Sequence, residues 1–152
     1  MRQEFVPREQ VLSVVAHGPE AWHIQDLFVT IDDAGEISSV RGTLRVLTAH
    51  CRDHFKRGYP AILPAAFTVE LVCQLATYPI LLKFPGRVPL LGEFRAKPLA
   101  AVFPGDLLEL RAELVEMKGM KGRARGEAFV GGKKIFEVEF EFRLAHPKVF
   151  AR

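Results

Sequence analysis

The hydrophobic pattern of the chain centres on residues 65–83, which would be apolar around nearly the whole circumference of a helix. The main polar interruptions are Glu70 and Gln74. A helix that is apolar on all sides is either buried in a domain or crosses a membrane, and a carboxylate inside it is costly unless it has a partner. Pro79 lacks the amide hydrogen that a helix needs, so we expect a kink or an end near Tyr78.

The residues before this helix predict a short helix and a β-hairpin. Residues 7–16 have apolar side chains at roughly helical spacing and begin with a proline that suits a first turn. Residues 22–31 alternate between two faces, so we expect a strand there, joined by a turn at residues 32–35 to a second strand over residues 37–47. Residues 50–64 contain a glycine and two prolines and are expected to form a loop.

Antiparallel strands are expected after the helix, over residues 88–97, 106–117, 122–130 and 133–144. In the last of these, five apolar side chains share one face: Phe136, Val138, Phe140, Phe142 and Leu144. The chain has no glycine-rich phosphate loop and no alternation of strands with helices, which argues against a parallel nucleotide-binding fold. A curved antiparallel sheet wrapped around the central helix would bury that helix, and its edges would need a second subunit. The predicted fold class is therefore α+β, in a single domain spanning residues 1–152.

The composition is that of a globular chain. Of the 152 residues, 49% are hydrophobic and 26% are charged, which excludes a disordered protein. The N-terminal residues are charged, unlike a signal peptide, and polar and proline interruptions make residues 61–82 a poor membrane span. The two cysteines, Cys51 and Cys73, fit neither a metal-ligand spacing nor a disulfide framework. We therefore expect a cytoplasmic protein without a metal site or a membrane span.

Positive charge is concentrated near one predicted hairpin. The net charge is +3, and residues 118–125 contain four cations: Lys118, Lys121, Arg123 and Arg125. A patch of this kind binds nucleic acid or an acidic protein, or is simply a solvated hairpin tip. It lacks the interleaved aromatic side chains of a base-stacking surface, so nucleic acid is the least favoured of the three.

Two titratable residues flank the loop that precedes the central helix. His54 ends a polar stretch, and an imidazole with an ordinary pKa of about 6.5 is a natural general base. Glu70 lies about one and a half turns into the helix, where burial is expected to raise its pKa and make it a proton donor. The backbone N–H groups of Ala65 and Ala66, at the helix N-terminus, can hold a developing oxyanion. This set fits proton abstraction beside a carbonyl.

Each of these residues also has a structural interpretation. A histidine in a loop is commonly just exposed, and a glutamate in a buried helix can serve a salt bridge. Gln74 shares the face of Glu70 and either supports it or bonds the sheet. Tyr59 borders a pocket or packs within the loop. Four histidines have no partner that the sequence identifies: His17, His23, His50 and His146.

The loop and helix together resemble the signature of the 3-hydroxyacyl-acyl-carrier-protein dehydratases of the FabZ/FabA type, which have a hotdog fold. In that family a run of the form HFPG…PVMPG…E…Q leads from the catalytic loop into the central helix. The matching residues here are His54-Phe55, Ile62-Leu63-Pro64-Ala65, Glu70 and Gln74. Residues 94–98 and 104–106 resemble the family's later FRRPVVPGD turn, the final hairpin is similar, and residues 11–26 faintly resemble its opening helix and PHR-type strand.

The chain departs from this signature in the catalytic loop. Lys56 and Arg57 replace Pro-Gly after the His-Phe pair, the loop to Pro64 is longer, and Ala65 replaces a glycine. These changes bear on the fit of the substrate more than on the fold.

The resemblance implies dehydration of a 3-hydroxyacyl thioester, on an acyl carrier protein or coenzyme A, to the trans-2-enoyl thioester. His54 would remove the C2 proton, Glu70 would deliver a proton to the leaving hydroxyl or orient the water, and the Ala65 N–H would hold the thioester oxygen. The other oxyanion-site or substrate-binding residues that the resemblance implies are Ala66, Gln74, Phe55, Tyr59 and Leu63. No metal or redox cofactor is implied.

The family's site is shared between two subunits, so the resemblance implies a homodimer at least. An acidic carrier protein would suit the basic residues 118–125 or the pair Lys56-Arg57. Two alternatives remain open. One is a hotdog acyl thioesterase in which Glu70 activates water, and the other is a non-catalytic acyl-binding hotdog subunit, which the altered loop and Ala65 favour.

Overall fold

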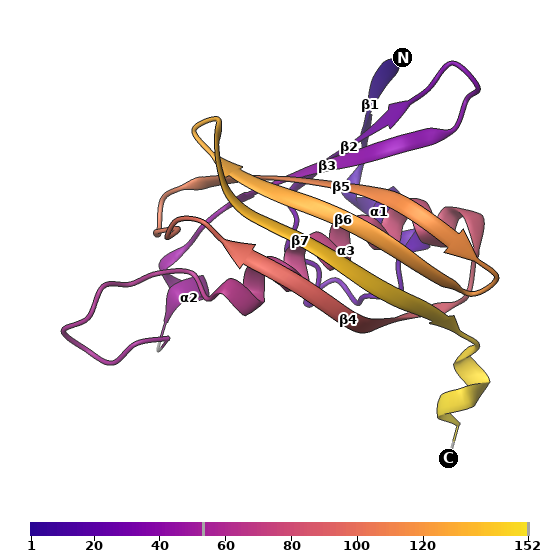
Figure 1. Ribbon diagram of the computed structural model, residues 1–152. Coiled ribbons are helices and arrows are strands. Elements are labelled where there is room, and N and C mark those ends of the chain that lie inside the picture. The colour runs from indigo at the N-terminus through magenta and orange to yellow at the C-terminus, as the bar shows by residue number, and fades with distance from the viewer. Residues whose placement is uncertain (53, 152) are drawn as a thin grey trace.

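The computed structural model describes residues 1–52 and 54–151. Within them, seven strands form one antiparallel sheet in the order β1-β2-β3-β5-β6-β7-β4 (Figure 1). The strands are β1 (Arg2–Val6), β2 (Asp26–Ile31), β3 (Ile37–Arg45), β4 (Val88–Pro98), β5 (Leu107–Lys118), β6 (Lys121–Val130) and β7 (Lys133–Ala145). The helices are α1 (Arg8–Val14), α2 (Thr48–Cys51), α3 (Ala65–Lys83) and the short 3-10 helix η1 (Pro147–Phe150).

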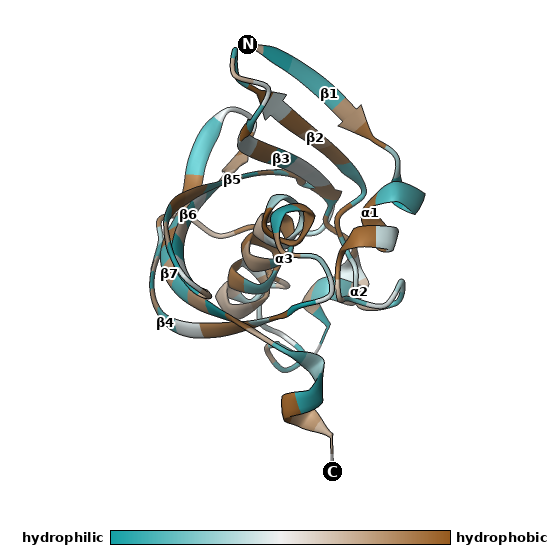
Figure 2. Ribbon diagram, turned by 90° about the vertical axis from the view of Figure 1, so that its right-hand side faces the viewer, coloured by the Kyte–Doolittle hydropathy of each residue, from teal (hydrophilic) through white to brown (hydrophobic). Residues whose placement is uncertain are grey.

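Helix α3 lies inside the curve of the sheet. Viewed end-on in Figure 2, the sheet from β3 to β4 bends around α3, and α1 lies on the other side of the helix. Leu71, Val72 and Leu75 of α3 are fully buried. The five apolar residues that the alternation assigns to one face of β7 are buried as well: Phe136, Val138, Phe140, Phe142 and Leu144. The structure confirms the predicted α+β fold with a curved sheet around a central helix.

Two glycines allow α3 to approach the sheet closely. A Cβ added at Gly42 of β3 would lie only 2.9 Å from Leu75 Cδ1, whereas carbon atoms ordinarily pack about 3.5–4.0 Å apart. Gly126 of β6 has even less room, because an added Cβ would meet Val72 Cγ1 and would lie 2.7 Å from the backbone oxygen of Arg111. Side chains of α3 therefore pack directly on the backbone of the sheet.

We expect Gly126→Ala to lower the free energy of unfolding by about 1–3 kcal/mol, the usual cost of overpacking a core. Urea denaturation followed by circular dichroism measures the change. Gly18→Ala is the matched control, because an added Cβ at Gly18 meets nothing within 4 Å. A Gly126→Ala protein as stable as this control would contradict the close packing of α3 on β6.

The N-terminal half contains elements that differ from the sequence prediction. The pattern does not predict β1, because only Val6 of its five residues is buried. Helix α2 has only four residues, of which His50 and Cys51 lie in the predicted loop, and it is too short to show a helical period. The strand expected from residue 22 begins only at Asp26, because Trp22 and Ile24 are buried outside the sheet and the Arg8 side chain bonds their carbonyl oxygens.

Helix α3 continues through Pro79 to Lys83, so the helix does not end near Tyr78. Tyr78 is buried, and its hydroxyl accepts a hydrogen bond from Gln10 Nε2 at 3.2 Å. This packing of the last turns offsets the hydrogen bond that a proline cannot donate. By length and composition alone α3 could cross a membrane, but 61% of its apolar window is buried inside the protein, as in the core helix of a globular domain.

Candidate active site

Glu70 and Gln74 lie one turn apart on α3 and are joined through their side chains. Gln74 Nε2 donates a hydrogen bond to Glu70 Oε1 at 3.0 Å. His17, from the segment between α1 and β2, places its Nε2 atom 3.6 Å from the same oxygen. The side chain of Glu70 is 50% exposed and that of His17 is 24% exposed. One carboxylate oxygen is thus held from two sides.

Gln74 also fixes the segment that carries His17. Its Nε2 group donates a second hydrogen bond, at 2.7 Å, to the carbonyl oxygen of Ala21, and its Oε1 accepts one from the backbone N–H of His23 at 3.3 Å. Gln74 is 1% exposed, so water does not compete strongly with these bonds. Of the two roles that the sequence allows, Gln74 supports Glu70, and its other bonds go to the segment before β2 rather than to the sheet.

The pKa of the Glu70 carboxyl lies below its usual value, so the expectation of a raised pKa is wrong. The interaction with the His17 imidazole is the largest cause, burial acts in the opposite direction, and the hydrogen bond from Gln74 lowers the pKa further. Desolvation does not dominate because the side chain is half exposed. Glu70 is therefore a carboxylate at neutral pH, suited to accept hydrogen bonds.

A cavity of about 90 Å³ lies beside Glu70, between α3 and the strands β4 and β7. Glu70, His17, Cys73 and Thr77 line it together with six apolar residues: Ile80, Pro89, Leu90, Leu91, Phe140 and Phe142. Burial and the charge of Glu70 raise the pKa of Cys73 to about 12, so the thiol stays protonated and is a poor nucleophile. We call this space the Glu70 cavity.

His54 lies on the exposed stretch between α2 and α3, which projects from the fold in Figure 1. Its ring packs on Phe55, with ring centroids 4.4 Å apart, and Phe55 packs on Tyr59. Lys56 Nζ lies 5.6 Å from the centre of the Tyr59 ring. His54 is not among the described residues that line the Glu70 cavity. The structure of one chain does not bring the two predicted catalytic residues together.

The N-terminus of α3 offers the expected free donors. The helix begins at Ala65, and its first ladder bond runs from the Phe67 N–H to the Pro64 carbonyl oxygen at 3.0 Å. The N–H groups of Ala65 and Ala66 precede this bond, and both residues are exposed. Leu63, which the resemblance places in the substrate site, is buried in the core.

The predicted carrier-binding cations on β5 and β6 are partly neutralised by carboxylates. Glu116 pairs with Arg123 at 2.9 Å and with Lys118 at 3.0 Å. Arg125 pairs with Glu113 on the neighbouring strand. Surface ion pairs contribute little stability, but they reduce the positive charge that an acidic partner would meet.

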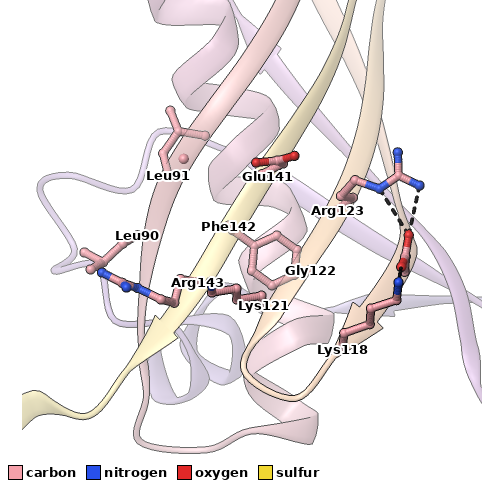
Figure 3. Close-up of a pocket in the computed structure, with 11 residues that line it drawn as sticks. Leu90, Leu91, Lys118, Lys121, Gly122, Arg123, Glu141, Phe142 and Arg143 are labelled. Atoms are coloured by element: carbon pink, nitrogen blue, oxygen red, sulfur yellow. Dashed lines mark hydrogen bonds and ion pairs between the residues drawn. The ribbon is translucent and has the colours of Figure 1, made fainter.

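Lys121 and Arg143 line a groove of about 410 Å³ at one end of the sheet (Figure 3). Neither cation has a carboxylate within ion-pair distance among the described residues. Lys121 is opposite Arg143 in the β6–β7 register, and Arg143 is opposite Leu90 in the β4–β7 register. Leu90, Leu91 and Phe142 line both this groove and the cavity described above. The cationic groove therefore adjoins the Glu70 cavity.

His17 is the residue of this site that the sequence does not identify. Its partner Glu70 is distant in sequence, because the β2–β3 hairpin lies between the two residues along the chain. The available signal is the faint resemblance of residues 11–26 to the family's opening helix and PHR-type strand, whose PHR motif also contains a histidine. That signal places a histidine before the first hairpin but does not give its contact with α3.

Comparison with known proteins identifies the family. No protein-family model matches the chain. A curated relative, the 3-hydroxyacyl-[acyl-carrier-protein] dehydratase FabZ of Clostridium acetobutylicum, is 38% identical over 95 residues, which are 59% of this chain and 67% of the relative. The chain belongs to the FabZ family. The FabZ of Clostridium kluyveri is 28% identical over 123 residues, covering 77% of this chain and 85% of the relative.

Solved structures show that this FabZ-family chain has the hotdog fold. The dehydratase heterocomplex ApeI:P from Xenorhabdus doucetiae matches with a TM-score of 0.72 at 14% identity, over 91% of this chain and 92% of that one. The fluoroacetyl-CoA thioesterase FlK matches with a TM-score of 0.66 at 20% identity, over 74% of this chain and 88% of that one. At these identities the likeness concerns the fold alone.

Proposed function

We propose that this protein dehydrates a 3-hydroxyacyl thioester, carried by an acyl carrier protein or by coenzyme A, to the trans-2-enoyl thioester. The observation that carries the proposal is the position of Glu70, an ionised carboxylate on the wall of an apolar cavity. A 3-hydroxyacyl chain combines an apolar tail with one hydroxyl near the thioester. The apolar walls suit the tail, and the carboxylate suits the hydroxyl.

The general base is proposed to come from a second copy of the chain. His54 is exposed and lies outside the Glu70 cavity, so a second chain can present it. β4 is an outer strand of the sheet, and it carries the exposed side chains of Leu91 and Phe94. An exposed strand edge of this kind is suited to pairing with a second copy. We therefore propose a homodimer at least.

The elimination breaks the C2–H and C3–O bonds, forms the C2=C3 double bond and releases water. His54 removes the C2 proton and returns it to the leaving oxygen, so the step requires no further proton. The Glu70 carboxylate accepts a hydrogen bond from the C3 hydroxyl and orients it. The family resemblance implies that Glu70 either delivers a proton to the leaving hydroxyl or orients the water, and a lowered pKa argues against proton delivery.

The thioester oxygen is proposed to bind at the N-terminus of α3. The free N–H groups of Ala65 and Ala66 lie at the positive end of the helix dipole, where they stabilise the oxygen as it gains enolate character. Phe55 and Tyr59 are proposed to contact the thioester arm beside His54. Leu63 is assigned a supporting role, because its side chain lies in the core.

We place the acidic carrier on the groove lined by Lys121 and Arg143, because this groove adjoins the Glu70 cavity. Lys121→Glu is expected to raise KM for a carrier-bound substrate by about 10-fold at low salt, and by less at about 0.5 M salt, because rim charges act mainly on association. Steady-state kinetics at the two salt concentrations measures this. Lys133→Glu is the control, since it makes the same charge change at the opposite end of the β6–β7 pair. Equal effects of the two variants would remove the groove from carrier binding.

The proposed activity is tested by incubating the protein with 3-hydroxyacyl and saturated acyl thioesters of several lengths, on both carriers. Enoyl absorbance reports dehydration, and free thiol reports hydrolysis. Enoyl product without thiol release supports the dehydratase. Thiol release from saturated substrates supports the second candidate, a thioesterase, which the lowered pKa of Glu70 favours because an ionised carboxylate can activate water. If neither product forms on either carrier, both the dehydratase and the thioesterase are overturned, and a non-catalytic acyl-binding subunit is favoured.

We also propose one domain and a cytoplasmic location. The buried apolar side chains form a single core cluster that includes residues from both ends of the chain, which supports one domain. Cys51 and Cys73 are free thiols, as expected in a reducing compartment.

A further inference from the structure

We infer that His17 is the positioning residue of this site: it fixes the Glu70 carboxylate so that Oε1 is occupied within the chain and Oε2 is left for the substrate hydroxyl. The inference deepens the proposed function and rests on it for the identity of the substrate. The contact between His17 and Glu70 is a property of the chain itself and can be measured without substrate.

The two oxygens of the Glu70 carboxylate have different surroundings. Gln74 Nε2 donates to Oε1 at 3.0 Å, and His17 Nε2 lies 3.6 Å from the same atom. No described residue donates a hydrogen bond to Oε2. The His17 contact is longer than a formed hydrogen bond, as catalytic contacts often are before substrate binds. A carboxylate held through one oxygen keeps the other available to an outside donor.

The His17 ring is held in a defined orientation. It packs edge-on against Trp22, with ring centroids 5.9 Å apart and planes at 65°. Its Nδ1 atom is enclosed and has no hydrogen-bond partner among the described residues. The tautomer with its hydrogen on Nε2 is therefore the one that gains a partner, and it directs that hydrogen at Glu70.

The backbone around His17 is fixed from two directions. The Arg8 guanidinium, on α1, donates to the carbonyl oxygen of Pro19 at 2.9 Å, and Gln74, on α3, donates to that of Ala21 at 2.7 Å. A side chain that orients a catalytic group needs such support, because small displacements at a reacting centre cost large factors in rate. The segment after α1 thus acts as a brace for the carboxylate.

The groups near Glu70 determine whether removing His17 raises or lowers the pKa of its carboxyl group. Besides His17, the titratable groups near the carboxylate are His23, which acts through its charge, and Cys73, whose thiol is protonated. The walls that β4 and β7 contribute to the cavity are apolar. Without His17, burial raises the pKa of the Glu70 carboxyl and mainly Gln74 opposes it. The pKa is therefore expected to rise.

The test compares His17→Leu, which removes the Nε2 donor, with His17→Gln, whose amide nitrogen can take its place. His17→Leu is expected to lower kcat by about 10-fold, with KM within about 3-fold of wild type, because orientation matters more in the transition state than in the ground state. The carboxylate form is present above its pKa, so a raised pKa moves the acid limb of the pH–kcat profile to higher pH. His17→Gln is expected to retain most of the activity, and His146→Leu, at an exposed position, serves as control.

A carbon-13 NMR titration of the Glu70 carboxyl separates this inference from the proposed function. The midpoint is expected at higher pH in His17→Leu than in the wild type and the His146→Leu control. If the wild type has no dehydratase activity but the titration midpoint of Glu70 shifts in His17→Leu, the proposed function is wrong and the contact between His17 and Glu70 is confirmed. An unchanged midpoint in His17→Leu, or equal losses of kcat in the leucine and glutamine variants, would overturn the positioning role.

Discussion

Replacing His54 by alanine is expected to lower kcat at least ~100-fold, the lower range for loss of a general base. The variant should fold normally, because His54 is exposed and its ring packs on the exposed side chain of Phe55. The measurement is the rate of enoyl formation at saturating 3-hydroxyacyl thioester. Thermal unfolding should give a Tm within about 2 °C of wild type, since a surface truncation changes stability little.

His146→Ala is the control for this variant, since it removes another exposed histidine, at the end of the chain beyond β7. It should retain wild-type turnover and the same Tm. If His54→Ala also retains near-wild-type turnover, His54 has no part in the reaction. The base would then have to be sought elsewhere in the site.

The sequence predicts the central helix and the C-terminal strands because their patterns are long and simple. From Phe136 to Leu144, apolar and charged residues alternate along β7, and the apolar residues are all buried. The start of α3 at Ala65 matches the prediction because Pro64 precedes it, whereas its end at Lys83 lies beyond the kink or end expected near Tyr78. Patterns of this length are hard to mistake for other elements.

The elements that the sequence does not predict are those held mainly by contacts with distant residues. β1 exposes four of its five residues and is held by backbone pairing with β2. The start of β2 is displaced because Arg8 and Gln74 bind the backbone of residues 19–24. Local propensity and hydrophobic periodicity do not predict such contacts, because the residues involved are distant in sequence.

The candidate site likewise has a part that the sequence predicts and a part that depends on distant contacts. The family motif identifies His54, Glu70 and Gln74, but it gives no information on the environment of the carboxyl group. Treating Glu70 as a residue buried in an apolar helix predicts a raised pKa, whereas the half-exposed side chain and its contact with His17 lower it. The pKa of a group depends on neighbours that are distant in sequence, so the sequence alone does not determine the protonation state of Glu70.

Glu70→Gln is expected to lower kcat by about 100-fold or more, because the amide has the size of the carboxylate but lacks the charge that orients the C3 hydroxyl. Gln74 can still donate to the remaining amide oxygen, so the brace around His17 should persist and KM should change little. Steady-state kinetics of enoyl formation measures both values. Turnover within about 3-fold of wild type would show that the charge of Glu70 has no role in catalysis.

Mixing the two inactive variants tests whether the site is shared between chains. A dimer of one His54→Ala chain with one Glu70→Gln chain contains one site in which both residues are native and one in which both are replaced. If subunits exchange freely, half of the dimers are mixed, so the 1:1 mixture should recover about a quarter of wild-type activity. A site built within a single chain cannot be restored in this way, because each chain lacks one of its two residues. Absence of recovery, with subunit exchange confirmed by mass spectrometry, would therefore contradict the shared site while leaving the individual roles of His54 and Glu70 intact.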